Sequence, residues 1–412
     1  MSTQSPRPNQ NAAASGPTPL VALLTLTFFG SLGTGILWSG VAFIAKHDFD
    51  YSVERSLVLY TIAALAYIAG AFGSASVTRA AARFVSTRGL VALIFLCQAL
   101  VCALPLAFRG EWVIWIISLG VSVFGSLIWP IVESYLTAGR HDADMRSAIG
   151  WFNVTWMSAV SLALIAMAPV IEQRAALALV ALVPASLLAI VALPWFGRAP
   201  GQHEPATWQA SITSEYPMLL GSARALLPAG YLLIGALSPL MPFRVEEVGA
   251  SPVVETPATA TWMVARVLAI TVLWRLPFWH GRWSVLLVGG IGLAAGFAMI
   301  VAAPGMATLL VGLAIFGAAQ GVVYYAALYY AMAVGAAAVE AGGTHEGLIG
   351  IGYAVGPLAA LAGIAGPQLI GLGIGPDSGI VIAVFAILAV VGGLALRPYR
   401  LALRHRSAAS GG

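Results

Sequence analysis

Long apolar segments separated by short polar ones make up most of this chain. The hydrocarbon core of a bilayer is about 30 Å thick, and about 20 apolar helical residues are needed to cross it. Segments of this kind lie at 19–45, 56–78, 89–108, 112–138, 147–170, 175–196, 225–243, 257–274, 284–303, 306–334, 347–374 and 378–396. The pattern predicts an all-α integral membrane protein with about twelve transmembrane helices.

A polar stretch at residues 197–224 divides these segments into two groups of six. We therefore expect two six-helix bundles joined by a cytoplasmic central loop, with a cytoplasmic tail at each end, the N-terminal one disordered. The corresponding ranges are 1–18, 19–196, 197–224, 225–396 and 397–412. A weak internal repeat, GVSVFGSLIWP from Gly120 and GLAIFGAAQGV from Gly312, indicates that the two bundles are pseudo-symmetric.

The basic residues predict how the helices are oriented. If the N-terminus is inside, fourteen arginines fall in inner segments, and the outer loops hold only Lys46, Arg55, Arg109, Arg174 and Arg244. Short loops rich in Lys and Arg remain in the cytoplasm. We therefore expect a multi-pass protein of the cytoplasmic (inner) membrane with both termini in the cytoplasm.

The composition agrees with a lipid environment and excludes several functions. Only 9% of the residues are charged, against about 25% in soluble domains. The basic residues are scattered, so nucleic acid is not an expected partner. Cys97 and Cys102 are five residues apart on one predicted helix and point to different faces, so neither a disulfide nor a metal pair is expected. The chain has no GxxxxGK[ST] motif for ATP. We expect no cofactor, no metal ligand and a monomer in the bilayer.

One arginine, Arg266, falls inside a predicted helix. It lies nine residues after Pro257, or roughly 14 Å along the helix, which is close to the middle of the bilayer. Trp262 is on the same face of this helix. A charge at that depth is costly and indicates function, so both residues are candidate substrate contacts. The guanidinium could bind an anionic substrate or serve as a counter-charge; a fixed contact with backbone carbonyls or a Trp ring is the alternative.

Glu133 is the one acidic residue that falls plainly inside the predicted helices. It continues a polar stripe with Ser122, Ser126 and Trp129, near the inner end of its helix. A carboxyl group that is alternately desolvated and wetted can bind and release a proton, so Glu133 is a candidate for proton coupling. The alternative is an inner gate, in which Glu133 pairs with Arg146 at the start of the next helix.

Two further helices carry polar and aromatic side chains that could line a cavity. Asn153 and Trp156 share a face of one helix, and Gln320 and Tyr324 share a face of another. Amides and phenols bind polar substrates, although they also join helices by hydrogen bonds. These four residues are candidate substrate contacts, and no residue is expected to be catalytic.

The order of segments resembles the major facilitator superfamily over nearly the whole chain, in a divergent bacterial form. The run PIVESYL from Pro130 is similar to the turn between helices 4 and 5 of a bacterial branch, and GYAVGP from Gly352 is similar to the GxxxGP element. The loop between helices 2 and 3, GSASVTRAAARFVSTRG from Gly73, lacks the aspartate of the GxxxDRxGRR pattern. The resemblance implies a secondary transporter that moves a small molecule by alternating access. Glu133 adds the hypothesis of proton coupling, and Arg266 that of an anionic substrate.

Two other functions are consistent with the sequence. A membrane sensor or scaffold built on a transporter fold would explain the missing aspartate. A polytopic glycosyltransferase would use an acidic pair in the first outer loop, where Asp48 and Asp50 lie. The loop of about ten residues is short for holding a sugar donor, and the midplane charge of Arg266 argues against a scaffold.

Overall fold

The computed structural model describes residues 16–140, 142–201, 215–334 and 339–410, and within these ranges it is helical and contains no strand. Within these ranges, twelve helices or runs of consecutive helices are long and apolar enough to cross a membrane. The predicted all-α membrane fold is therefore confirmed. Residues 1–15, most of the predicted N-terminal tail, lie outside the described ranges.

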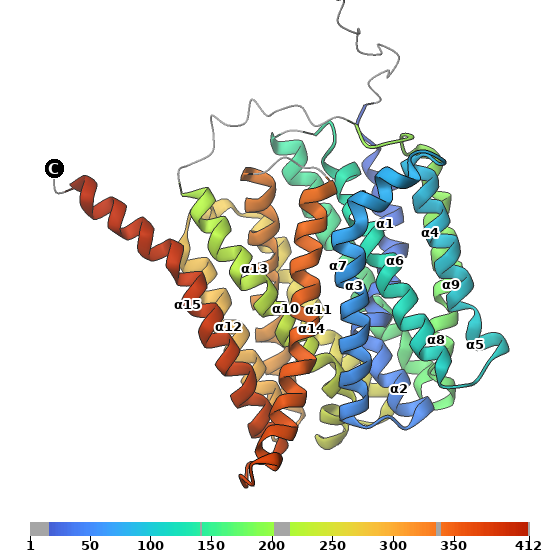
Figure 1. Cartoon of the computed structure of the whole chain (residues 1–412), viewed down its shortest axis with the longest axis vertical. Coiled ribbons are helices and arrows are strands. Elements are labelled where there is room, and N and C mark those ends of the chain that lie inside the picture. Colours follow the sequence, from blue (N-terminus) through green and yellow to red (C-terminus); the bar gives the residue numbers. More distant parts are fainter. Residues whose placement is uncertain (1–15, 141, 202–214, 335–338, 411–412) are drawn as a thin grey trace, which may run out of the picture.

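The N-terminal half contains the first six membrane-crossing segments (Figure 1). Its helices are α1 (Leu20–Gly35), a π-helical turn (Ile36–Gly40), α2 (Val41–Phe49), α3 (Val53–Ala81), α4 (Thr87–Cys102), α5 (Leu104–Ala107), α6 (Trp112–Thr137), α7 (Asp142–Arg174), α8 (Leu177–Val180) and α9 (Leu182–Val191). The C-terminal half contains α10 (Tyr216–Glu247), α11 (Pro252–Arg275), α12 (Trp283–Val301), α13 (Met306–Val334), α14 (Val339–Leu369) and α15 (Pro376–Ser410).

Several helices differ in length from the apolar segments that predicted them. Helix α10 begins at Tyr216 rather than at 225, and α14 begins at Val339 rather than at 347. Helix α15 continues to Ser410, through much of the predicted C-terminal tail. The length of an apolar segment reflects the thickness of the bilayer, whereas a helix continues for as long as its backbone hydrogen bonds are formed. Helix α14 ends at Leu369, before the predicted 374, where a glycine-rich turn with Gly371 at φ +67° follows.

The two halves repeat the same pattern of helix packing. Helix α1 packs on α7 as α10 packs on α14, and α3 packs on α6 as α11 packs on α13. Glycines allow the closest of these approaches. A Cβ atom on Gly35 would lie 2.9 Å from the Cα atom of Val160, and one on Gly356 would lie 2.6 Å from the amide nitrogen of Ala236. Such contacts bring helix backbones together, as is common in membrane bundles.

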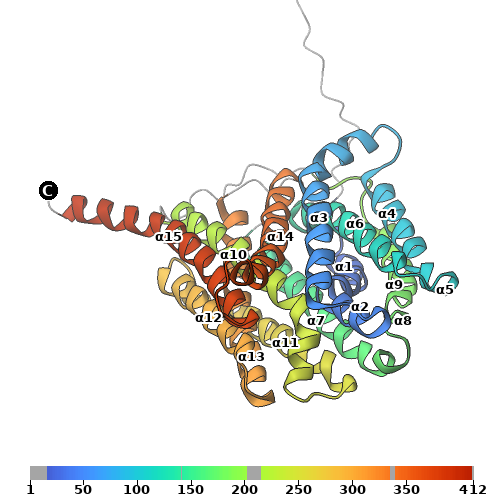
Figure 2. The same ribbon diagram turned by 60° about the horizontal axis from the view of Figure 1, so that its bottom comes forward.

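The halves meet along two pairs of helices, α3 with α14 and α7 with α11. Seen from the side, both described ends of the chain lie at the same end of the bundle (Figure 1), and the tilted view separates the two groups of helices (Figure 2). We call this end the termini end and the opposite one the gate end. Helices α2 and α10 also touch, near the gate end.

Candidate functional site

A cavity lies at the centre of the molecule, and both halves contribute to its wall. The lining residues are Ser31, Thr34, Trp38, Tyr67, Trp129, Glu133, Phe152, Trp156, Tyr231, Tyr324, Glu346, Ile349 and Tyr353. Eight of these thirteen side chains are aromatic, and two are carboxylates. The cavity therefore offers flat apolar surfaces together with acidic groups.

Two local features position the aromatic rings on the N-terminal side of the cavity. The π-helical turn at Ile36–Gly40 contains Trp38, whose ring stacks on Tyr353 from the other half with centroids 4.0 Å apart. Asn153 is buried and accepts a hydrogen bond from the indole nitrogen of Trp156 at 3.1 Å. Asn153 therefore orients a cavity residue and is not itself part of the wall.

Arg266 lies directly behind this aromatic wall. Its guanidinium carbon is 4.5 Å from the ring centroid of Tyr324 and 4.9 Å from that of Trp156. The guanidinium also donates a hydrogen bond of 3.1 Å to the hydroxyl of Tyr231. The residue is only 1% exposed and does not line the cavity. The predicted contact with a Trp ring is therefore made, and direct contact with a substrate would require the rings to move.

Two acidic side chains approach each other across the halves at the cavity. One ligand atom from each of Glu133, His345 and Glu346 lies within 4.8 Å of the others, and all three residues are buried. Glu133 comes from α6, whereas His345 and Glu346 come from α14. The hydroxyl of Tyr67, on α3, donates a hydrogen bond to Glu346. The site therefore joins the two halves through titratable groups.

The expectation that Glu133 is the sole intramembrane carboxylate is wrong. Glu346 is 5% exposed and Glu255 is 2% exposed, and both lie within membrane-crossing helices. The apolar segments predicted at 347–374 and 257–274 begin just after these residues, because an acidic residue lowers the local hydropathy. The sequence does contain a pattern that could have identified Glu346. It shares the i, i+3, i+7 spacing of one helix face with Ile349 and Tyr353, and all three residues line the cavity.

Arg146 does not meet Glu133. It is exposed near the start of α7. Its positive charge acts instead on His280, whose pKa is lowered mainly by burial and further by Arg146. His280 follows α11 in a turn at the termini end and stacks on Tyr329, with centroids 4.7 Å apart. Among the described residues, no ion pair joins Arg146 to Glu133, so the predicted gate contact is not present.

Trp262 and Gln320 lie away from the cavity wall. Trp262 packs against Phe316, with ring centroids 6.0 Å apart. Gln320 is fully buried beside Gly230, and its amide has no hydrogen-bond partner among the described residues. Of the predicted site residues, Glu133, Trp156 and Tyr324 line the cavity.

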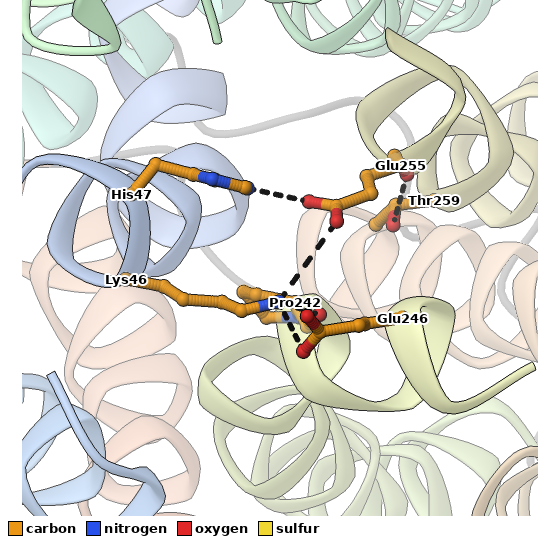
Figure 3. A network of polar contacts seen from close by, with 6 residues as sticks. All are labelled: Lys46, His47, Pro242, Glu246, Glu255 and Thr259. Atoms are coloured by element: carbon orange, nitrogen blue, oxygen red, sulfur yellow. Dashed lines mark hydrogen bonds and ion pairs between the residues drawn. The ribbon is translucent and has the colours of Figure 1, made fainter. Parts of the chain in front are cut away.

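A polar network connects the two halves at the gate end (Figure 3). The amino group of Lys46, on α2, is 2.8 Å from the Glu246 carboxylate and donates to the carbonyl of Pro242 at 2.8 Å. The imidazole of His47 is 2.8 Å from the carboxylate of Glu255, on α11. We call these four side chains, Lys46, His47, Glu246 and Glu255, the gate-end network. Its members must separate if the cavity is to open at this end.

Comparisons with known proteins identify the fold. No protein-family model and no protein of curated function matches the sequence. The structure of a point mutant of the nucleoside transporter NupG matches with a TM-score of 0.60 at 13% identity, over 92% of this chain and 99% of that one. A bacterial homolog of the human lysosomal transporter Spinster, inward-facing and unoccupied, matches with a TM-score of 0.62 at 14% identity, over 93% and 97%.

The human organic anion transporter MFSD10 matches with a TM-score of 0.61 at 16% identity, over 93% of this chain and 99% of that one. Identities this low establish similarity of fold and not of substrate. Both halves of the chain take part in each match, because the coverage is nearly complete. The chain thus has the fold of the major facilitator transporters.

Proposed function

We propose that the chain is a secondary transporter, which carries a small organic molecule through the central cavity by alternating access and is coupled to protons. The observation that carries the proposal is the cavity itself, whose wall is shared by the two halves and holds a buried carboxylate from each. Rocking of the halves about such a site exposes it to one side of the membrane and then to the other. Positive charge in the inner segments supports cytoplasmic termini, in the cytoplasmic membrane.

The wall of the cavity favours a substrate with a planar or apolar part. Aromatic side chains predominate there, and rings such as Trp38 and Tyr353 already stack across the halves. Neighbours of this fold include a nucleoside transporter and an organic anion transporter. An anionic substrate, however, would be repelled in the cavity, because Glu133 and Glu346 line it and Arg266 lies behind the rings. Arg266 is therefore proposed as a counter-charge within the bundle and not as the group that binds an anion.

Proton coupling follows from the arrangement of the two carboxylates. Two negative charges in a buried site repel each other strongly, and a single shared proton relieves the repulsion. Glu133 and Glu346 belong to different halves, so movement of the halves changes their separation. In the proposed cycle a proton binds when the carboxylates are close and leaves when they separate and become hydrated.

Neither alternative function gains support from the geometry. Both carboxylate oxygens of Asp48 accept backbone N–H groups, from Ala175 at 2.9 Å and from Ala176 at 2.7 Å. This side chain therefore holds the turn between α7 and α8, which is a structural use and not that of an acid poised for glycosyl transfer. A sensor or scaffold would not require charged groups from both halves around a central cavity.

The experiment is uptake into proteoliposomes with a substrate first found by thermal-shift screening. Wild-type protein should accumulate the substrate when a pH gradient is imposed. Glu133→Gln and Glu346→Gln should abolish pH-driven accumulation but retain exchange of labelled for unlabelled substrate. Glu54→Gln, which changes an exposed glutamate at the start of α3, is the control and should behave as wild type. Undiminished pH-driven accumulation by both cavity variants would exclude the coupling role.

A further inference from the structure

We propose that Glu133, His345 and Glu346 form a site for a divalent transition-metal ion such as Zn²⁺, shared between the two halves. The role of such an ion rests on the proposed transport function, but its binding can be measured without transport. The donor atoms of these three side chains lie within 4.8 Å of one another. A site of this kind departs from the sequence-based expectation of no metal ligand.

All three side chains are buried, and burying a polar or charged group costs free energy. They are 4%, 8% and 5% exposed in the order Glu133, His345 and Glu346. The Nε2 atom of His345 is buried and has no hydrogen-bond partner among the described residues. Buried polar atoms are nearly always satisfied by protein, water or an ion. His345 therefore combines a buried nitrogen that has no partner with a ring nitrogen within 4.8 Å of both carboxylates, and this combination points to a ligand.

The set of donors selects the class of cation. Imidazole suits zinc and neighbouring transition metals, whereas Mg²⁺ and Ca²⁺ prefer oxygen ligands alone. Tetrahedral zinc with bonds of about 2.1 Å keeps its ligands about 3.4 Å apart. The observed upper limit of 4.8 Å can close to that separation by small rotations of the side chains.

Tyr67 holds one of the proposed ligands in place by a hydrogen bond, as residues around a metal site commonly do. Its hydroxyl donates to the carboxylate of Glu346, and ligating carboxylates are commonly oriented by such hydrogen bonds. A divalent ion would also balance the two carboxylates electrically. Three protein ligands leave one tetrahedral position open, and the cavity lined by Glu133 and Glu346 is where a donor atom of a substrate could complete it.

The location of the site gives the ion a mechanical role. Glu133 is near the end of α6, and the other two ligands are near the start of α14, so the site is toward the termini end. An ion bound to ligands from both halves would hold them together there. Opening at this end would then require the ion to leave or to lose the ligand from one half.

The test is metal binding by the purified full chain without a histidine tag. Zn²⁺ should raise the melting temperature in proportion to the logarithm of its concentration, and Co²⁺ should give the visible absorption of a four-coordinate site. His345→Gln and Glu346→Gln should each weaken binding by at least about tenfold. His280→Gln changes the histidine at the termini end that stacks on Tyr329 and should bind as wild type.

The outcomes separate this inference from the proposed function. Absence of any Zn²⁺ or Co²⁺ effect on the wild type would overturn the metal site, as would binding by both His345→Gln and Glu346→Gln that is as tight as that of the wild type. If that happens while Glu133→Gln still loses pH-driven accumulation, the carboxylates hold a shared proton only, and the transport proposal stands. Metal-free melting curves of each variant establish that it is folded, and Glu133→Gln serves as a third ligand variant if either of the others is not.

Discussion

Arg266 is a buried positive charge surrounded by aromatic rings. Its guanidinium faces the rings of Trp156, Tyr231 and Tyr324 at 4.5–5.7 Å, donates one hydrogen bond to a phenol and leaves its Nε atom without a partner among the described residues. Each cation–π contact in a desolvated site contributes about 1–2 kcal/mol. These contacts offset part of the cost of burial and fix the positions of three cavity rings.

We expect Arg266→Gln to reduce uptake by about 30-fold or more, since losing a buried charged partner costs about 2–5 kcal/mol. Expression should stay near the wild-type level, because glutamine keeps a donor for Tyr231. Uptake into proteoliposomes and the yield of folded protein would be measured together. Arg275→Gln is the matched control, because Arg275 is exposed on the same helix and also stacks on a tryptophan, Trp274. A variant that folds poorly yet transports normally once purified would make Arg266 a structural residue.

Individual site residues could be predicted only where their helix was placed correctly. Glu133, Trp156 and Tyr324 lie well inside apolar segments, and all three line the cavity. Glu346 is missed because the apolar segment begins at 347, one residue after it, whereas α14 itself begins at Val339. Gln320 and Trp262 were predicted from polarity and helix face alone, and that information does not distinguish the cavity from the interior of a half.

At the scale of the elements, the first membrane crossing is interrupted by the π-helical turn at Ile36–Gly40. Such turns often mark functional sites, because the extra residue changes which side chains face inward. Here the turn contains Trp38, the ring that stacks on Tyr353 across the halves. The sequence predicts the crossing but not the turn, since no local pattern of residues specifies it.

The glycines of α14 give a test of helix packing. A Cβ atom on Gly356 would lie 2.6 Å from the amide nitrogen of Ala236 on α10, whereas one on Gly366 of the same helix would meet nothing within 4 Å. We expect Gly356→Ala to destabilise the protein by about 1–3 kcal/mol, the usual cost of overpacking. Gly366→Ala should leave stability unchanged or slightly raised, as alanine favours helix.

Thermal unfolding in detergent, followed by the fluorescence of a thiol dye or of tryptophan, would measure both glycine variants. Equal melting temperatures for Gly356→Ala and Gly366→Ala would contradict the close contact between α10 and α14. The comparison is well matched, because both substitutions add one methyl group to one helix.

At the scale of the whole molecule, the fold was largely predictable. Twelve crossings follow from the lengths of the apolar segments, and the division into halves follows from the polar stretch after residue 196. The contacts between halves could not be derived in the same way. The gate-end network and the Glu133–Glu346 approach join residues more than 190 positions apart, and hydropathy carries no information on such pairs.

The orientation in the membrane is a prediction that reporter fusions can test. Fusions after Arg109, Arg174 and Glu247, at the gate end, should report the outside of the cell. Fusions after Arg88, Arg140 and Arg400, at the termini end, should report the cytoplasm, as should one after Gln209, which is outside the described residues. The expectation rests on the excess of arginine in the inner segments. Two or more fusions reporting the opposite side would contradict it.

The central claim, that the halves must part at the gate end for transport, is tested most directly by locking that end. Lys46 and Glu246 are 2.8 Å apart in the gate-end network. Cysteines at both positions, in a chain whose Cys97 and Cys102 are replaced by alanine, can be joined by a short cleavable thiol cross-linker. We predict that uptake of the screened substrate stops on cross-linking and returns when the linker is cleaved, while the uptake of each single-cysteine variant is not changed by the cross-linker. Full uptake by the cross-linked protein would contradict alternating access through this cavity.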